Sequence, residues 1–294
     1  MKKLFLSVII LINVFLLFAE EGYVTFVDGY ADLQDGSDWI YLDIGDTVKE
    51  SDTIKLDYDS FIEIKFHDTK LTISQEGTYH IDSLLSDDAS LSNSNFGSKV
   101  NDIFSKLLYE DKSLSQSTVG GVRASDAALE ADNIFGEGYF NDIAAEAKDM
   151  YKDGDIDSAY DLFLDAYDFA EDNEQETEAL YYLALISYES GEIRNALSYI
   201  DDIYLNEYSD FYGYVVFLKG KILLDTHGYQ QSLDWLAENP LEEDDPLMQS
   251  VMLIEGLATI KNGDASNGKT ILKQCAALNP NSDLAGTAQY FINQ

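Results

Sequence analysis

One short phrase returns four times in the second half of the chain, and it limits the fold of that half more than any other feature. In each copy, a glycine with a polar neighbour separates two stretches whose apolar residues recur at helical spacing. These glycines are Gly154, Gly191, Gly228 and Gly263, at intervals of 37, 37 and 35 residues. A period of this length is typical of a solenoid in which each repeat is one pair of antiparallel helices.

Small residues recur around each turn, where two paired helices must approach closely. In the first and last repeats they are Ala147, Ala159, Ala166, Gly256, Gly268 and Cys275. Larger residues follow where the helices interlock, namely Phe163, Ile200, Leu236 and Leu272. This pattern resembles the tetratricopeptide repeat over about residues 140–282, and Pro280 closes the last copy. The resemblance implies an α-solenoid of about four repeats over residues 140–294, with residues 284–292 as a capping helix.

The chain begins with the pattern of a targeting signal. Two lysines precede an almost unbroken apolar run over residues 4–18, and residues 19–22 change abruptly to small and acidic. The run is shorter than the roughly 20 residues that span a bilayer, which favours a cleaved signal peptide at residues 1–19. Leu17 is larger than the usual residue at the −3 position, so an uncleaved membrane anchor stays open as the alternative. We therefore expect an extracytoplasmic location, periplasmic or envelope-associated.

Residues 22–81 change to a period of two. Residues 61–66 alternate apolar and polar side chains, and residues 40–44 do the same, so that Ile40, Leu42 and Ile44 are expected to point inward. Turns are predicted at residues 28–29, 35–36, 45–46 and 68–70. Many short strands with frequent turns indicate a small antiparallel β-sandwich or barrel.

Two acidic turns in this region resemble those of the FecR-type β-domain. That family has a Gly-Asp pair, then a hydrophobic residue, then a small residue followed by Asp; here these are Gly45-Asp46 and Ser51-Asp52. Its late strand is matched most nearly by residues 120–125. The resemblance implies a FecR-like β-domain over residues 22–130 in an extracytoplasmic setting, with a helical and loop insertion at about residues 83–118.

The charge balance limits the partners of the chain. It has 18 Lys and Arg against 55 Asp and Glu, a formal net charge of −37. Nucleic acid and anionic membrane surfaces repel such a chain, so we expect no nucleic-acid partner. The acidic surface keeps the protein soluble, or meets cations or a basic partner.

No residue pattern points to catalysis, a cofactor or a metal. The alternating acids of residues 153–157 fail the calcium-loop pattern, because its sixth and twelfth positions fall on Ser158 and Leu164 instead of Gly and Glu. The chain has a single cysteine, and its three histidines lack paired ligand spacing: His67, His80 and His227. It also lacks a nucleophile elbow and a phosphate loop. We therefore predict a protein that is not an enzyme.

The inner face of the first helices is the remaining candidate site, because solenoids bind peptides and proteins along such faces. The repeat period places seven side chains there: Tyr151, Lys152, Tyr181, Tyr188, Tyr214, Phe217 and Lys221. Tyrosine gives a large contact area at low entropic cost. The alternative is that these rings pack against neighbouring helices.

The predicted fold class is α+β and multidomain, with an all-β FecR-like domain followed by an α-solenoid. The expected function is that of a non-enzymatic envelope scaffold or adaptor that binds an envelope protein or peptide. Two alternatives stay open. One is a cell-wall carbohydrate-binding protein that contacts peptidoglycan through the β-domain, and the other is a FecR-like component of envelope signalling.

Overall fold

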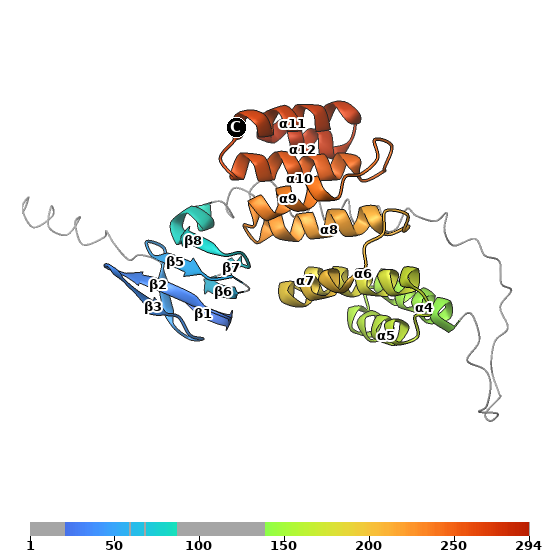
Figure 1. Cartoon of the computed structure of the whole chain (residues 1–294), viewed down its shortest axis with the longest axis horizontal. Helices are drawn as coiled ribbons and strands as arrows, with labels where there is room; N and C mark the ends of the chain where they lie inside the picture. Colours follow the sequence, from blue (N-terminus) through green and yellow to red (C-terminus); the bar gives the residue numbers. More distant parts are fainter. Residues whose placement is uncertain (1–20, 59, 68, 87–138, 294) are drawn as a thin grey trace, which may run out of the picture. The chain divides into compact units, whose positions relative to one another are not determined.

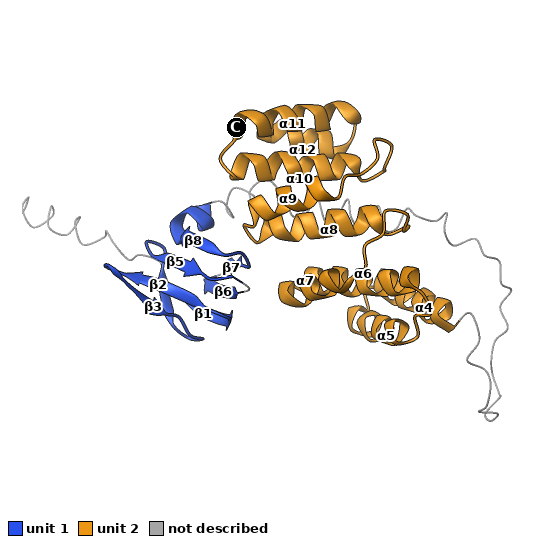
Figure 2. Cartoon of the chain, in the orientation of Figure 1, with its two compact units in different colours: residues 1–93 blue, residues 94–294 orange. Residues whose placement is uncertain are grey.

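The computed structural model describes residues 21–58, 60–67, 69–86 and 139–293. The chain divides into two compact units, Met1–Asn93 and Ser94–Gln294, coloured blue and orange in Figure 2. In the described ranges, no helix is both long and apolar enough to cross a membrane. The expected signal peptide, most of the expected insertion and the strand at residues 120–125 lie outside these ranges.

The first unit is a sandwich of two four-stranded antiparallel sheets. One sheet has the order β4-β1-β6-β7 and the other the order β3-β2-β5-β8. The strands are β1 (Glu21–Asp28), β2 (Ala31–Asp35), β3 (Asp38–Tyr41), β4 (Thr47–Lys49), β5 (Thr53–Leu56), β6 (Phe61–Phe66), β7 (Thr69–Ile73) and β8 (Gly77–His80). Buried residues of both sheets, among them Val24, Ile64, Ile54 and Leu56, form one core. The all-β character predicted for this region is confirmed.

Strand β6 follows the predicted alternation. Its apolar residues Ile62, Ile64 and Phe66 are buried, because they face the opposite sheet, whereas its two charged residues face away from the core. The turn that follows is shorter than expected over residues 68–70, since β7 already begins at Thr69.

The alternation predicted for residues 40–44 is wrong. Strand β3 ends at Tyr41, and of the three residues expected to point inward only Leu42 is buried. Ile40 is 50% exposed and Ile44 is 59% exposed. Ile40 is exposed because β3 stands at the edge of its sheet, where its inward side has less of the opposite sheet to pack on. Ile44 is exposed because it lies beyond the strand, in the turn between Asp43 and Asp46.

Two aspartates stabilise successive turns of the sandwich. The Asp46 carboxylate accepts the backbone N–H of Asp43 at 2.8 Å, and the Asp52 carboxylate accepts that of Lys49 at 2.8 Å. Gly45, in the first of these turns, has a φ of +92°, a conformation that favours glycine. The two acids that carry the FecR resemblance therefore hold the backbone between β3 and β5.

Within residues 139–293, the second unit consists of four helical hairpins and a final helix (Figure 1). The hairpins are α4 (Tyr139–Asp153) with α5 (Ile156–Asp168), α6 (Asn173–Glu189) with α7 (Ile193–Asp202), α8 (Tyr212–Asp225) with α9 (Tyr229–Glu238), and α10 (Met248–Lys261) with α11 (Ala265–Leu278). The final helix α12 (Asp283–Ile292) packs on α11 and α10, where a capping helix was predicted. This arrangement confirms the predicted α-solenoid, and it resembles the solenoid of tetratricopeptide-repeat proteins.

The hairpin turns correct the repeat period. Gly154, Gly191 and Gly263 have φ angles of +81°, +77° and +99°. In the third hairpin the left-handed residue is His227, with a φ of +63°, and Gly228 instead caps the start of α9. The structural intervals are therefore 37, 36 and 36 residues, and the predicted third turn is displaced by one residue. The sequence pattern placed the turn at Gly228 because glycine is the usual residue with positive φ, but histidine also adopts this conformation at modest cost.

Two glycines allow α10 and α11 to approach closely. A β-carbon at Gly268 would lie 2.6 Å from the carbonyl oxygen of Gly256 and 2.9 Å from the backbone nitrogen of Ile260. Because these are backbone atoms, a β-carbon at Gly268 would force α10 and α11 apart. At Gly286, in α12, a β-carbon would have no atom within 4 Å apart from its chain neighbours and the backbone of its own helix.

We expect the same substitution to act in opposite directions at these two sites. Gly268→Ala should lower the free energy of unfolding by about 1–3 kcal/mol, because the methyl group is forced against backbone. Gly286→Ala should raise it by about 0.5–1 kcal/mol, because alanine favours the helix. Urea unfolding of the full chain, followed by the helical circular dichroism signal, measures both. Equal changes in the free energy of unfolding for the two variants would contradict the close approach of α10 and α11.

Candidate functional site

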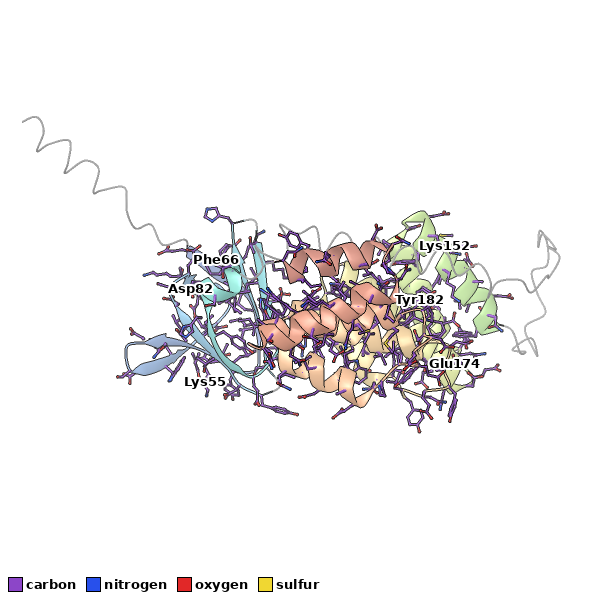
Figure 3. The ribbon with its side chains drawn as sticks, turned by 90° about the horizontal axis from the view of Figure 1, so that it is seen from above. Lys55, Phe66, Asp82, Lys152, Glu174 and Tyr182 are labelled. Atoms are coloured by element: carbon purple, nitrogen blue, oxygen red, sulfur yellow. The ribbon has the colours of Figure 1, made fainter. Side chains whose placement is uncertain are left out.

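The seven predicted site residues lie on the first helices α4, α6 and α8, and they differ in exposure. Four are buried, namely Tyr151, Tyr181, Phe217 and Lys221. Tyr188 and Tyr214 are half-buried, and Lys152, labelled in Figure 3, is exposed. Packing against neighbouring helices, the alternative considered for this face, therefore describes the four buried side chains. Binding of a partner by any of the seven stays a prediction.

Aromatic rings join the first three hairpins in an aromatic cluster formed by Phe163, Tyr181, Tyr182, Phe211 and Tyr214. The Phe163 ring stacks on that of Tyr182 with centroids 4.5 Å apart. The Tyr181 ring lies 5.3 Å from Tyr182, and it reaches Phe211 at 5.5 Å and Tyr214 at 5.8 Å. Such ring pairs contribute about 0.5–1.5 kcal/mol each beyond the area they bury. The cluster therefore couples α5, α6 and the start of α8.

A second set of contacts between hairpins is polar and recurs at the repeat spacing. The Tyr151 hydroxyl donates to Glu189 Oε2 at 2.6 Å, 38 residues later. The Tyr188 hydroxyl donates to Asp225 Oδ2, 37 residues later. In each pair the tyrosine stands three residues before its own left-handed turn, and the acid stands two residues before the next one. These two pairs form a tyrosine–carboxylate ladder between successive first helices.

The second pair of the ladder also holds a buried cation. Lys221 is 1% exposed, and its Nζ lies 2.5 Å from Asp225 Oδ2 and 5.3 Å from the centre of the Tyr188 ring. A buried ammonium group is stable when an opposite charge and hydrogen bonds surround it. Tyr188, Asp225 and Lys221 therefore act as one network that holds α6 against α8.

Burial and charge set the protonation of the ladder. Burial, and then the charge of Asp225, raise the pKa of Tyr188 well above its usual value, so its hydroxyl remains a donor at neutral pH. Burial raises the pKa of the Glu189 carboxyl, and the hydrogen bond from Tyr151 partly lowers it again. Without that hydrogen bond, the pKa of Glu189 should rise further.

The acids of the ladder and two rings of the aromatic cluster were not predicted from the sequence. Glu189 and Asp225 occupy the same position relative to the turn, but the displaced turn at Gly228 concealed this. The signal that marks Tyr182, labelled in Figure 3, is the tyrosine doublet at residues 181–182. Phe211 precedes α8 in a connection that interrupts the repeat period, so the period does not predict its contact.

The described residues show no metal centre. No group of three or more His, Cys, Asp or Glu side chains among them is arranged to hold a metal ion. His67 and His227 occupy turns with positive φ, and His80 Nδ1 lies 2.9 Å from Thr53 Oγ1. Burial raises the pKa of the Cys275 thiol to about 12, so the thiol stays protonated and a poor nucleophile. The lack of enzyme activity stays a prediction.

A pocket of about 420 Å³ lies at the start of α6, beside the connection between α7 and α8. It is lined by Asp172, Asn173, Glu174, Thr177, Tyr204, Asn206 and Ser209. One lining acid, Glu174, already accepts hydrogen bonds from the Ser209 hydroxyl at 3.0 Å and from the Asp210 N–H at 2.9 Å. The acid therefore fastens the connection to α6.

Two solved structures are similar to part of the chain. One is a MamA RS-1 ArsTM double mutant, with 16% identity and a TM-score of 0.42, and the match covers 52% of this chain and 90% of that one. The other is TTC0263, a thermophilic TPR protein in Thermus thermophilus, with 20% identity and a TM-score of 0.41, covering 52% and 80%. No known protein family and no curated protein matches the chain. The assignment of the fold rests on the hairpins themselves.

Replacing Asp225 tests the buried network. Asp225→Asn should lower the free energy of unfolding by about 2–3 kcal/mol, because it removes the carboxylate that pairs with the buried ammonium group of Lys221. The matched control is Glu189→Gln, which changes the acid of the other pair, where the described residues show no ion pair with a buried cation. It should lower the free energy of unfolding by about 1 kcal/mol. Adding Lys221→Met to Asp225→Asn should restore much of the loss, since the buried charge is then gone. Urea unfolding measures all three, and equal losses for the two acids would contradict the network.

Replacing Tyr151 tests the first pair through pH. The folded-state pKa of Glu189 is raised, so the folded protein binds this proton more tightly than the unfolded chain, and stability falls as pH rises from the unfolded to the folded pKa. Tyr151→Phe raises that pKa further. The substitution should therefore lower the free energy of unfolding by about 1 kcal/mol at neutral pH, and by less at acidic pH, where Glu189 is protonated. Urea unfolding at several pH values checks this, and a loss that does not vary with pH would contradict it.

Proposed function

We propose that this protein is an extracytoplasmic scaffold whose solenoid binds a protein or peptide of the cell envelope. The observation that carries the proposal is the row of four stacked hairpins, since solenoids use the extended surface of such rows to bind partners. The apolar run at residues 4–18 supports export from the cytoplasm. On this proposal, the chain acts by binding and not by catalysis.

The predicted site residues on the first helices have two different roles, according to how deeply each side chain is buried. Tyr181 and Phe217 shape the surface from beneath, because their side chains are almost wholly covered. Lys152, Tyr188 and Tyr214 keep exposed atoms on the same helices, and we propose that they contact the partner. Exposed tyrosines make good contacts of this kind because their rings are large and rigid.

The net charge supports a partner with a basic surface. A charge of −37 attracts cationic segments and speeds their association at low salt. Exposed tyrosines in the connection between α7 and α8 add to this surface, since Tyr204 is 73% exposed and Tyr208 is 84% exposed. Rings of this kind attract lysine and arginine through cation–π contacts.

We propose that the β-sandwich is a FecR-like domain that accompanies the solenoid in the envelope. The two aspartate-stabilised turns support this, because the resemblance rests on those residues. A role in envelope signalling would follow if the sandwich and the solenoid bound different members of one pathway. Cleavage of the signal peptide would release the chain, whereas an uncleaved segment would anchor it.

Site-specific photo-crosslinking in living cells tests the binding surface. A photoreactive residue at position 152 or 214 of the full chain should capture the same envelope protein. Positions 165 and 273, which are exposed on the second helices α5 and α11, are the matched controls and should capture none. Capture at the control positions alone, or of cytoplasmic proteins alone, would contradict the proposal.

A further inference from the structure

Strand β3 leaves one edge of its sheet open among the described strands. It stands at the end of the order β3-β2-β5-β8 and pairs with β2 alone, from Asp32 opposite Tyr41 to Asp35 opposite Asp38. The next residue, Leu42, donates its N–H to Ala31 on the β2 side at 2.8 Å. Because N–H groups alternate in direction along a strand, those of Trp39 and Tyr41 point to the open edge.

The four-residue edge strand β3 carries neither lysine nor proline, two residues that protect many natural edge strands from pairing. The edge strand β7 has Lys70, paired with Glu63 at 2.6 Å, and β4 has three residues with a lysine at its end. Strand β3 reads Asp-Trp-Ile-Tyr, and its three large side chains are 41%, 50% and 48% exposed. An edge this apolar is suited to accept another strand.

Aromatic rings stand beside this edge on the outer face of the sheet. Ile40 pairs with Leu33, which packs on the core, so the alternation places Trp39 and Tyr41 on the opposite face. The Tyr30 ring meets the Tyr41 ring edge-on, with centroids 6.2 Å apart, and is 67% exposed. The β3 platform, formed by Tyr30, Trp39 and Tyr41, therefore exposes ring surface that attracts cations.

Charge selects the partner of the platform. The Asp32 carboxylate lies on the same face, opposite Tyr41, and the nearest lysine in the register, Lys55, is already paired with Asp57 at 3.1 Å. A second copy of a chain with net charge −37 would be repelled. An uncharged glycan feels no long-range attraction to the negative charge of the chain. A segment rich in lysine or arginine gains from that charge, from the Asp32 carboxylate and from the rings.

We propose that the open edge of β3 binds an extended basic segment of a partner protein, which adds to the sheet as a fifth strand. The backbone N–H and C=O groups of Trp39 and Tyr41 bond to the incoming strand, and alternate basic side chains lie over the platform rings. The Asp32 carboxylate, which shares the outer face with these rings, neutralises one of those side chains. This site is separate from the solenoid surface and does not depend on it.

Fluorescence of Trp39 reports binding at this site. The chain has two tryptophans, and Trp235→Phe in the full-length protein leaves Trp39 as the single emitter. The probe is a synthetic peptide of alternating lysine and valine; the comparison probes are the same peptide with glutamate for lysine, and chitohexaose for a glycan. The lysine peptide should change the emission saturably and more weakly at high salt. A response to chitohexaose without one to the lysine peptide would overturn the proposal.

Charge variants locate the site on the platform. Asp32→Asn should weaken binding about threefold, because one partly exposed charge pair on the face of the rings is lost. The matched control is Glu76→Gln, which has the same net charge and changes an exposed acid away from β3. It should leave binding unchanged. Equal weakening by the two substitutions would show attraction to the chain as a whole and would overturn the site.

Backbone variants test the addition of a strand. Tyr41→Thr and Tyr41→Pro both remove the ring, but only proline also removes the N–H at the open edge, which is a position that an edge strand tolerates. Proline should weaken binding about fivefold more than threonine. The same peptide with alternate amides N-methylated gives a second measurement that leaves the protein unchanged, and it should not bind. If the methylated peptide binds as well as the parent, strand addition is overturned.

Discussion

A single helical hairpin cannot bury its own apolar face, so each hairpin of the solenoid depends on its contact with the next. Two kinds of contact meet that need between the first three hairpins. The aromatic cluster supplies buried area from Phe163 to Tyr214, and the tyrosine–carboxylate ladder supplies directional hydrogen bonds at the repeat spacing. The buried charge of Lys221 makes the second contact sensitive to the loss of a single partner.

These contacts also decide which surface is available for binding. The tyrosine and lysine side chains that would mark a groove by residue type alone are largely used to join the hairpins, as the burial of Tyr181 and Lys221 shows. What remains for a partner is the half-exposed rings and the acidic surroundings. In the β-sandwich the situation is reversed, since Trp39 and Tyr41 lie at an edge with no described strand beyond it. The two units therefore present different chemistry to partners.

Periodic patterns predicted the fold well, because they report local geometry. The alternation in β6 and the small residues around the hairpin turns follow directly from which side chains face a neighbour. The pattern at residues 40–44 failed, because Ile40 stands on an edge strand with less packing and Ile44 lies in the turn beyond that strand. The third hairpin turn was misplaced because glycine is preferred but not required at a residue with positive φ. Contacts between hairpins, such as that of Tyr188 with Asp225, could be predicted only with the third turn placed correctly. The spacing of residues does not reveal which ligand a surface binds.

The solenoid depends most on α6 and α8 being held together as one cooperative structure. Native-state hydrogen exchange of the full chain tests it, because amides that open in the same event share one opening free energy. We predict equal values for the buried amides of the two helices, and a parallel fall in both when Tyr188→Phe removes the hydrogen bond to Asp225. If α6 alone loses protection while α8 keeps its value, the hairpins open independently and the account is contradicted.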